Sequence, residues 1–183
     1  MAPDEQQLIR QIQVDGSHDA FRVLVELYMK QAYNVAYGYV NDHDDAEDIA
    51  QESFVRVFRS IRSFRGDAEF GTWLYRIVSN LAMNHIRRHK HSVARETRTF
   101  EKAAEQSVSH SDAIERQEMQ EGIERALHEL PTLQRATVIL RHIQGLSTRQ
   151  VGDILRCSEG TVKTHLHRGL KKLKSKLQDL RES

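Results

Sequence analysis

Apolar residues recur along the chain at intervals of three and four, which is the spacing of one face of an α-helix. A short amphipathic segment in residues 1–16 is followed by longer stretches with the same spacing. The pattern therefore predicts an all-α protein. The expected helices cover about 21–40, 44–61, 72–89, 113–130, 131–144, 148–155 and 158–173.

Capping residues mark where several of these helices should begin. Asp44 is followed three residues later by Glu47, the arrangement of a capping box, and predicts a helix start at residue 44. Pro131 stands where prolines are preferred, at the opening of a helix. In the helix after Pro131 we expect the core face to consist of Leu133, Val138, Ile139, Leu140 and Ile143.

One stretch has too few apolar residues to form a core. Residues 92–112 are mostly polar and charged, and this composition predicts a flexible linker. The linker divides the chain into two small helical domains, expected at residues 1–91 and 113–183.

The segment 145–173 has the pattern of a helix-turn-helix motif. Ser147 and Gln150 form a capping box at the start of its first helix, and Arg156-Cys157-Ser158 is the expected turn. On the second helix, the predicted buried stripe is Val162, Leu166, Leu170 and Leu173, and the predicted outer face is Lys163, Thr164, His167, Arg168 and Lys171.

Charge is distributed unevenly along the chain, although the formal net charge is only +1. Between residues 160 and 176 there are six Lys or Arg and no acidic residue, whereas a merely solvated helix usually mixes both signs. Gly152 weakens its helix by about 1 kcal/mol relative to Ala, so we expect it where the two helices approach most closely. These features predict DNA binding by the second helix.

A second basic surface and an acidic one are predicted in the N-terminal half. Residues 70–95 contain no Asp or Glu, while residues 42–52 contain six acidic residues and no Lys or Arg. Two glycines make residues 64–71 a loop. The outer stripe of the helix after this loop should carry Arg76, Asn80, Asn84 and Arg87, and the outer face of the acidic helix should carry Asp48, Gln51 and Glu52.

Other features limit the function classes. The single cysteine, Cys157, excludes an internal disulfide, and no apolar run is long enough for a membrane span or signal peptide. We therefore expect a cytoplasmic protein that is not inserted in a membrane. A metal-dependent enzyme is an alternative, since His43, Asp44, Asp48 and Glu52 could offer ligands. Without a second cluster or a phosphate-binding loop, we predict no catalytic residue, metal or cofactor.

Two longer strings resemble one family. DAEDIAQESFVRVFRSIRSFRGDAEFGTWLYRIVSN (residues 45–80) resembles conserved region 2 of the extracytoplasmic-function (ECF) sigma factors of bacterial RNA polymerase. LHELPTLQRATVILRHIQGLSTRQVGDILRCSEGTVKTHLHRGLKKL (residues 127–173) is similar to their region 4. The resemblance covers both domains and implies promoter recognition and melting as a polymerase subunit. The alternative is a stand-alone helix-turn-helix transcription regulator that acts as a dimer.

The resemblance also implies partners and roles. Core RNA polymerase would be contacted at its β′ clamp coiled coil and β flap, and family members are often held inactive by an anti-sigma factor. Asp48, Gln51 and Glu52 would dock on the coiled coil. The minus-ten box of promoter DNA would be opened by Phe64, Phe70, Trp73, Arg76, Asn80, Asn84 and Arg87. The minus-thirty-five box would be recognised by Lys163, Thr164, His167, Arg168 and Lys171.

Three residues leave parts of this assignment open. Trp73 shares a stripe with Ile77 and Leu81, which favours core packing for its ring. Arg156 stands where the family commonly has a glycine in the turn, and His165 stands where an arginine is common. These two departures affect the expected promoter preference and not the class of protein.

Overall fold

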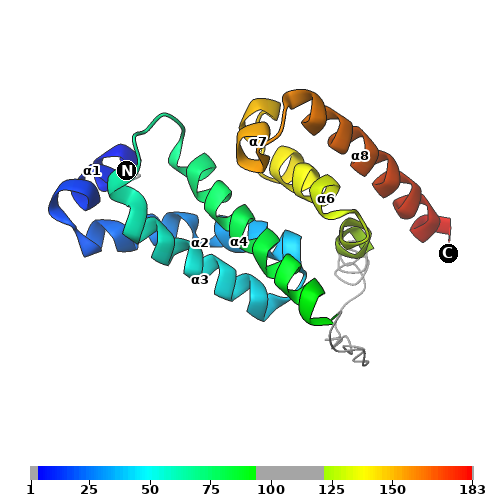
Figure 1. Ribbon diagram of the computed structural model, residues 1–183, viewed down its shortest axis with the longest axis horizontal. Coiled ribbons are helices and arrows are strands. Elements are labelled where there is room, and N and C mark those ends of the chain that lie inside the picture. The colour runs from blue at the N-terminus through cyan, green and yellow to red at the C-terminus, as the bar shows by residue number, and fades with distance from the viewer. Residues whose placement is uncertain (1–3, 94–121, 183) are drawn as a thin grey trace.

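The computed structural model describes residues 4–93 and 122–182, and every regular element in these ranges is helical, which confirms the all-α, two-domain prediction. Figure 1 shows the two domains side by side. Residues 122–128 are also helical, and most of the predicted linker lies outside the described residues. The elements are α1 (Glu5–Asp15), α2 (His18–Val40), α3 (His43–Ser60), the 3₁₀ turn η1 (Ile61–Ser63), α4 (Phe70–Val93), α6 (Thr132–Val138), the π-helical turn η2 (Ile139–Ile143), α7 (Thr148–Leu155) and α8 (Glu159–Glu182).

The start of α3 differs from the prediction. Asn41 ends α2 in the left-handed conformation, with φ 57°, and the extended backbone of Asp42 follows directly. The Asp42 side chain can therefore accept a hydrogen bond from the Asp45 backbone N–H at 3.1 Å, which makes Asp42 the capping residue. Asp44 lies inside the first turn of the helix, so the predicted cap at Asp44 is wrong by two residues.

The core of the N-terminal domain forms where α2 packs against α3 and α4. Burying a large apolar side chain stabilises the fold by about 1.5–3 kcal/mol, and this core contains several that water does not reach. The most deeply buried are Leu24, Val35, Tyr39, Val57, Leu74 and Val78.

The core face predicted for α6 and η2 is only partly correct. Leu133 is 45% exposed and Ile143 is 56% exposed, so neither belongs to the core. The Gln144 N–H bonds to the carbonyl of Ile139 at 3.0 Å, a span of five residues that widens the helix and turns Ile143 outward. Helical dihedral angles begin at Thr132, one residue after the predicted Pro131, because the Pro131 ψ of 139° lies outside the helical region.

The buried stripe of α8 also shifts from the predicted positions. Leu170 is 39% exposed, whereas Gly169 beside it is buried. A Cβ on Gly169 would lie 3.0 Å from Val138 Cγ2 of α6, so the two helices approach closely at this point. The stripe runs through Val162, Leu166, Gly169 and Leu173, and a pattern based on large apolar residues does not detect the glycine.

The two domains share one hydrophobic core. The fully buried Ile139 of η2 packs against α2 at Gly38, where a Cβ would lie only 2.7 Å from its Cδ1 atom. Leu140, Val151 and Ile154 of the C-terminal domain belong to the same buried cluster as the N-terminal core. Only a residue without a side chain allows the helices to approach this closely, so Gly38 permits the contact.

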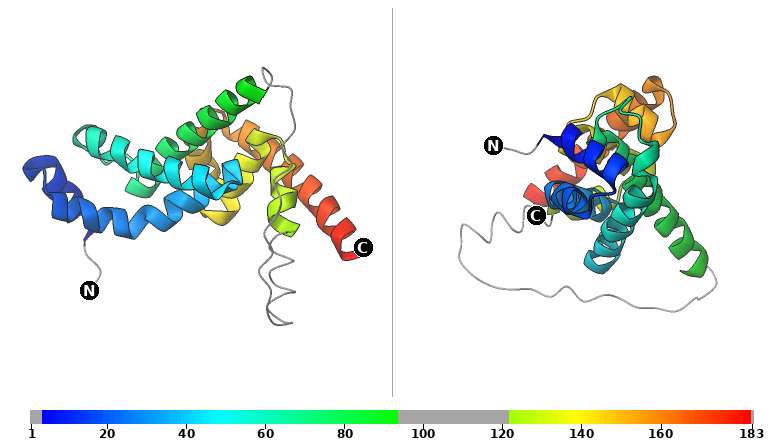
Figure 2. Two further views of the ribbon diagram at one scale, coloured as in Figure 1. Left: turned by 90° about the horizontal axis from the view of Figure 1, so that it is seen from below. Right: turned by 90° about the vertical axis from the view of Figure 1, so that its left-hand side faces the viewer.

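Two hydrogen bonds also join the domains. Gln150 of α7 donates to the Thr72 hydroxyl of α4 at 3.2 Å, and the Tyr37 hydroxyl donates to Glu124 at 3.2 Å. Thr72 is buried. The helix α7 thus packs on the N-terminal part of α4, and the views in Figures 1 and 2 show the same arrangement.

The half-buried His128 of the C-terminal domain is hydrogen-bonded to Arg135. Arg135 Nη1 donates to His128 Nδ1 at 2.7 Å and to the His128 carbonyl at 3.1 Å. Since a guanidinium only donates, the imidazole must accept at Nδ1 and stay neutral. Burial, and secondly the Arg135 charge, lower the pKa of His128 from 6.5 to about 4.

We therefore expect a stability loss on acidification that can be assigned to His128. The folded protein binds this proton less readily than the unfolded chain, so the contribution is complete above pH 6.5 and is lost as the pH falls toward 4. The expected loss is on the order of 1–2 kcal/mol after allowance for solvent screening. Urea unfolding of His128→Gln should have a flatter pH profile over this range, and the same change at exposed His142 should leave the wild-type slope intact.

Candidate nucleic-acid and polymerase interfaces

Local hydrogen bonds build the helix-turn-helix as the sequence predicts. Ser147 Oγ accepts from the Gln150 N–H at 3.2 Å, and Gln150 Oε1 accepts from the Ser147 N–H at 2.8 Å, which confirms the capping box. Ser158 Oγ accepts from the Thr161 N–H at 3.1 Å and caps α8. Both helices of the motif therefore begin at a capped residue, and the Cys157 N–H closes the turn between them by donating to the Gly152 carbonyl at 3.0 Å.

Arg156 occupies a strained position in this turn. Its φ is 53°, the left-handed region, in which a residue with a Cβ costs about 1–2 kcal/mol. This geometry gives the physical reason for the glycine that is common there in the family. Cys157 is half-buried beside it, and burial raises the pKa of its thiol, which therefore stays protonated at neutral pH.

Gly152 has the close contact that the sequence predicts. A Cβ at this position would lie 2.8 Å from the backbone oxygen of Cys157 and 3.7 Å from Val162 Cγ2 of α8. The oxygen belongs to the main chain of the turn and cannot rotate away. The glycine is thus required for the packing of α7 against the turn.

Gly152→Ala should destabilise the C-terminal domain by about 1–3 kcal/mol, because the clash outweighs the better helix propensity of alanine. Guanidinium unfolding measures this change. Gly160→Ala is the matched control: its Cβ would find Ser158 Oγ at an ordinary 3.7 Å, so it should stabilise the protein slightly. Equal effects of the two substitutions would contradict the packing argument.

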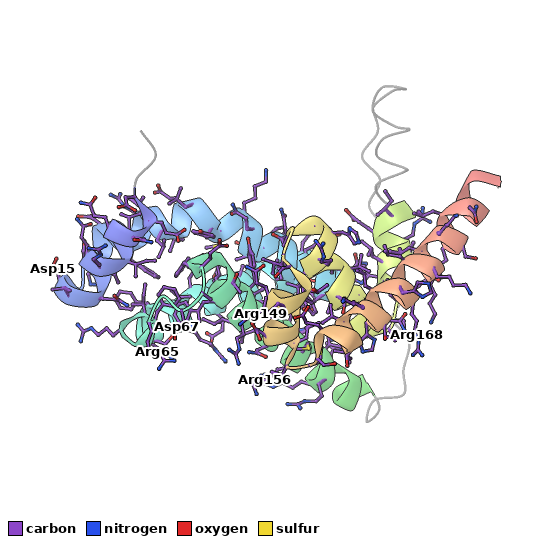
Figure 3. All side chains as sticks on the ribbon, turned by 90° about the horizontal axis from the view of Figure 1, so that it is seen from above. Asp15, Arg65, Asp67, Arg149, Arg156 and Arg168 are labelled. Carbon is purple, nitrogen blue, oxygen red and sulfur yellow. The ribbon has the colours of Figure 1, made fainter. Side chains whose placement is uncertain are left out.

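The predicted recognition face of α8 is open to solvent. Lys163, Thr164, His167, Arg168 and Lys171 are all exposed. The Thr164 hydroxyl donates to the Gly160 carbonyl at 2.9 Å, one turn earlier on the same helix. Figure 3 shows the side chains of this helix, with Arg168 labelled on its exposed side. The arrangement offers cationic and hydrogen-bonding groups along one side of a straight helix, as major-groove contact requires.

Aromatic rings gather around the loop before α4. The rings of Phe64 and Trp73 are half-buried, with centroids 5.0 Å apart. Phe70 is only 1% exposed and packs edge-on against Tyr28 at 5.1 Å. Phe70 also packs against Phe64 and Trp73, with ring centroids 6.0 and 5.8 Å away, and it lines the pocket between the loop and α1.

The predicted polar stripe lies on one side of α4. Arg76 and Arg87 are exposed, while Asn80 and Asn84 are half-buried. Arg87 Nη2 donates to Asn84 Oδ1 at 3.1 Å, which leaves the Asn84 amide nitrogen as its hydrogen-bond donor toward a ligand. The stripe thus contains two cations, which can bind phosphates, and two amides, which can form hydrogen bonds with base edges.

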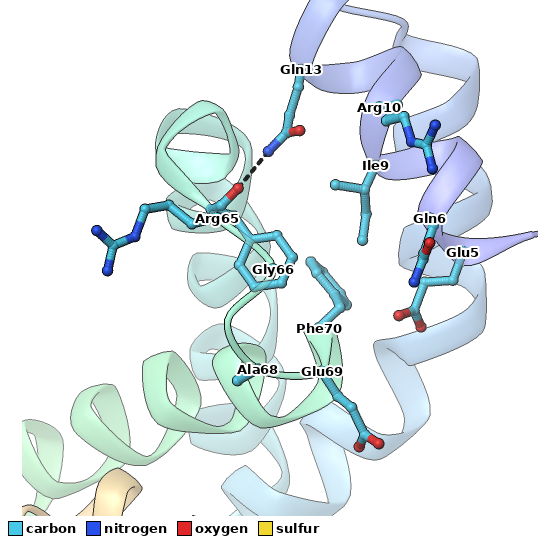
Figure 4. A pocket seen from close by; sticks show the side chains of 11 residues that line it. Glu5, Gln6, Ile9, Arg10, Gln13, Arg65, Gly66, Ala68, Glu69 and Phe70 are labelled. Carbon is cyan, nitrogen blue, oxygen red and sulfur yellow. Dashed lines mark hydrogen bonds between the residues drawn. The ribbon is translucent and has the colours of Figure 1, made fainter.

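Helix α1 contributes to this region, although the sequence assigned it no role. A cavity of about 400 Å³ lies between α1 and the loop, and Figure 4 shows side chains of both walls. Gln13 Nε2 donates to the carbonyls of Ile61 and Phe64 at 2.8 and 2.7 Å. The sequence does contain one sign of this role: Gln13 is a polar residue on the apolar side of the helix, four positions after Ile9.

The acidic face of α3 is exposed as predicted. Asp48, Gln51 and Glu52 are all accessible to solvent. Glu52 forms an ion pair with Arg56 at 2.9 Å, and Gln51 donates to Glu47 at 3.1 Å. Such exposed pairs are worth only about 0.3–0.5 kcal/mol, so they compete weakly with a partner's charges.

The metal-site alternative places candidate ligands at His43, Asp44, Asp48 and Glu52. Within residues 4–93 and 122–182, no three His, Cys, Asp or Glu side chains are grouped to hold a metal ion. His43 instead stacks on Tyr37 at 4.7 Å and contacts the Tyr33 hydroxyl. None of the helices in the described ranges combines the length and apolarity needed to cross a membrane.

These surfaces define a class: helical DNA-binding proteins with two domains, one carrying a helix-turn-helix. Residues 24–92 match the family model of sigma-70 region 2, and residues 120–173 match that of sigma-70 region 4. The chain belongs to the ECF sigma factors of the sigma-70 family. Members of this family are not enzymes; they direct transcription initiation by RNA polymerase.

Relatives of known function match over almost the whole chain. The ECF RNA polymerase sigma factor SigW of Bacillus subtilis is 34% identical over 173 residues, covering 90% of this chain and 92% of SigW. The RNA polymerase sigma-H factor of Pseudomonas aeruginosa is 33% identical over 184 residues, covering 96% and 95%.

Two solved structures have the same fold. The sigma factor RpoE in complex with the anti-sigma factor NepR from Bartonella quintana superposes with a TM-score of 0.73 at 23% identity, covering 86% of this chain and 96% of RpoE. CnrH, in complex with the cytosolic domain of CnrY, superposes with a TM-score of 0.69 at 21% identity, covering 96% and 99%.

Proposed function

We propose that each surface of the chain has its own partner during initiation. The α3 face (Asp48, Gln51 and Glu52) docks on the β′ clamp coiled coil of core polymerase, and the C-terminal domain contacts the β flap. The N-terminal domain, residues 1–91, recognises and opens the minus-ten box of promoter DNA. The C-terminal domain, residues 113–183, binds the minus-thirty-five box through α8.

The separation of charge supports this proposal above all. The exposed carboxylates of α3 suit a basic partner through charge-assisted hydrogen bonds. Opening the minus-ten box extrudes a base at a cost of a few kcal/mol, and a cavity, aromatic rings and cations along the single strand can oppose the return of the base. Phe64, Phe70 and Trp73 supply the rings, Arg76 and Arg87 the cations, and Asn80 and Asn84 the amides. Lys163, Thr164, His167, Arg168 and Lys171 contact bases and phosphates of the upstream box.

Transcription with purified components tests the proposal. Core RNA polymerase without sigma factor is mixed with the chain and with DNA in which two hexamers, a fixed distance apart, are randomised. Run-off transcripts from a selected subset of templates are expected. If the chain fails to comigrate with core polymerase in gel filtration, and instead forms a stable dimer that binds a palindrome, the stand-alone regulator is the correct reading.

We also infer that the chain acts in the cytoplasm and that an anti-sigma factor holds it inactive. The support for the second inference is that RpoE forms a complex with the anti-sigma factor NepR, that CnrH forms one with the cytosolic domain of CnrY, and that both have this fold. Affinity purification of the chain from its host, followed by mass spectrometry, should recover such a partner in stoichiometric amount.

A further inference from the structure

We propose that α1 forms the second wall of the site for the opened strand, with Gln13 as the residue that positions the minus-ten loop. This inference rests on the proposed function, because it concerns the site at which that function places the extruded base.

The two hydrogen bonds of Gln13 carry the inference. Its amide nitrogen donates to backbone carbonyls on both sides of residues 62–63, 48 and 51 positions away in the sequence. The loop from Phe64 to Glu69 has no regular structure, and Gly66 adopts a φ of 75° within it. A segment of this kind has many accessible conformations, and fixing its first carbonyl, that of Phe64, together with the Ile61 carbonyl of η1 to a helix selects among them.

The helix that carries Gln13 is itself held firmly. Ile9 and Ile12 are buried in the N-terminal core. Near its other end, Glu5 accepts a hydrogen bond from the Tyr28 hydroxyl, and Tyr28 packs against Phe70 beneath the aromatic rings. The helix can therefore act as a rigid support, which is what precise positioning of a loop requires.

The cavity between the two walls has a composition suited to a nucleobase. Ile9, Phe64 and Phe70 give it apolar surface, and the Gln6 and Arg10 side chains of α1 add hydrogen-bonding groups (Figure 4). The carboxylates of Glu5 and Glu69 also line it and can accept hydrogen bonds from the amino groups of a base. Its volume of about 400 Å³ lies within the range of small-molecule sites. A displaced loop would alter this wall, so Gln13 influences base selection without touching the base.

The test compares two substitutions of one residue type on one helix. Gln13→Met keeps the length of the side chain and removes both donors, while Gln11→Met changes an exposed glutamine two positions away. The probe is a fluorescent single-stranded hexamer, taken from the non-template strand of a promoter that the wild-type holoenzyme selects, together with its single-base variants.

For Gln13→Met we expect about tenfold weaker hexamer binding and reduced discrimination at one position, with unchanged binding to the minus-thirty-five duplex. A merely structural defect would weaken all hexamers equally and leave their ratios unchanged. If the affinity ratios among the hexamers are the same for Gln13→Met as for Gln11→Met, the inference is overturned.

Hydrogen exchange of the full-length protein provides a second measurement that does not depend on DNA. Exchange in residues 62–69 should be faster in Gln13→Met than in Gln11→Met, and unchanged exchange there would refute the positioning role. If the wild-type chain binds no hexamer and starts no transcript, the proposed function fails, while the exchange experiment still decides whether Gln13 holds the loop.

Discussion

Replacing Asp48 and Glu52 with lysine is expected to reduce the affinity of the chain for core RNA polymerase by about a hundredfold or more. Hydrogen bonds to charged groups contribute about 1.5–3 kcal/mol each, and lysine would repel a basic partner in addition. Both side chains are exposed, and the ion pair lost with Arg56 is worth only a few tenths of a kcal/mol. The fold should therefore survive the double substitution.

Competition for core polymerase against a labelled sigma factor measures this loss. The control is the pair Glu26→Lys and Asp153→Lys, which makes the same change in net charge at exposed positions on α2 and α7. If the control weakens binding as much as the α3 pair does, long-range charge accounts for the effect and α3 is not the docking face.

Arg168→Ala should weaken binding to the minus-thirty-five duplex about tenfold to a hundredfold and relax the preference at one base pair. An arginine that contacts a base edge contributes about 1–3 kcal/mol of discrimination. Because Arg168 is exposed, its removal leaves the packing of α8 unchanged. Fluorescence anisotropy with a selected duplex and its single-base-pair variants gives both quantities.

Lys172→Ala provides the contrasting result. This lysine lies on the same helix and is expected to contact phosphate, so its loss should weaken all duplexes about equally and lower the slope of binding against salt by about one. If Arg168→Ala also weakens all duplexes equally, Arg168 binds the DNA backbone, and neighbouring residues select the bases.

Local sequence signals predicted the helix-turn-helix well. The capping box of α7 depends on residues three apart, and the requirement for Gly152 depends on a turn only a few residues away. The prediction failed where packing against distant elements decides the outcome. The π-helical turn moves Ile143 to the surface, and the buried stripe of α8 passes through Gly169, which has no side chain to signal burial.

The role of α1 and the contact between domains were also beyond local reasoning. Gln13 bonds to backbone atoms about fifty residues away, and carbonyls leave no trace in a residue pattern. The sequence predicts the two domains but not a contact between them, and Gly38 and Ile139 form such a contact. Long-range contacts of this kind follow from the fold as a whole.

The core that both domains share has a consequence for access to DNA. While α7 covers Thr72 and the first turns of α4, a promoter strand that binds these turns as proposed can bind only molecules in which the two domains have separated. Its measured affinity is then the intrinsic affinity multiplied by the parted fraction. Any surface that grips both halves and holds them apart raises that fraction, so such a surface would strengthen DNA binding without touching a nucleotide.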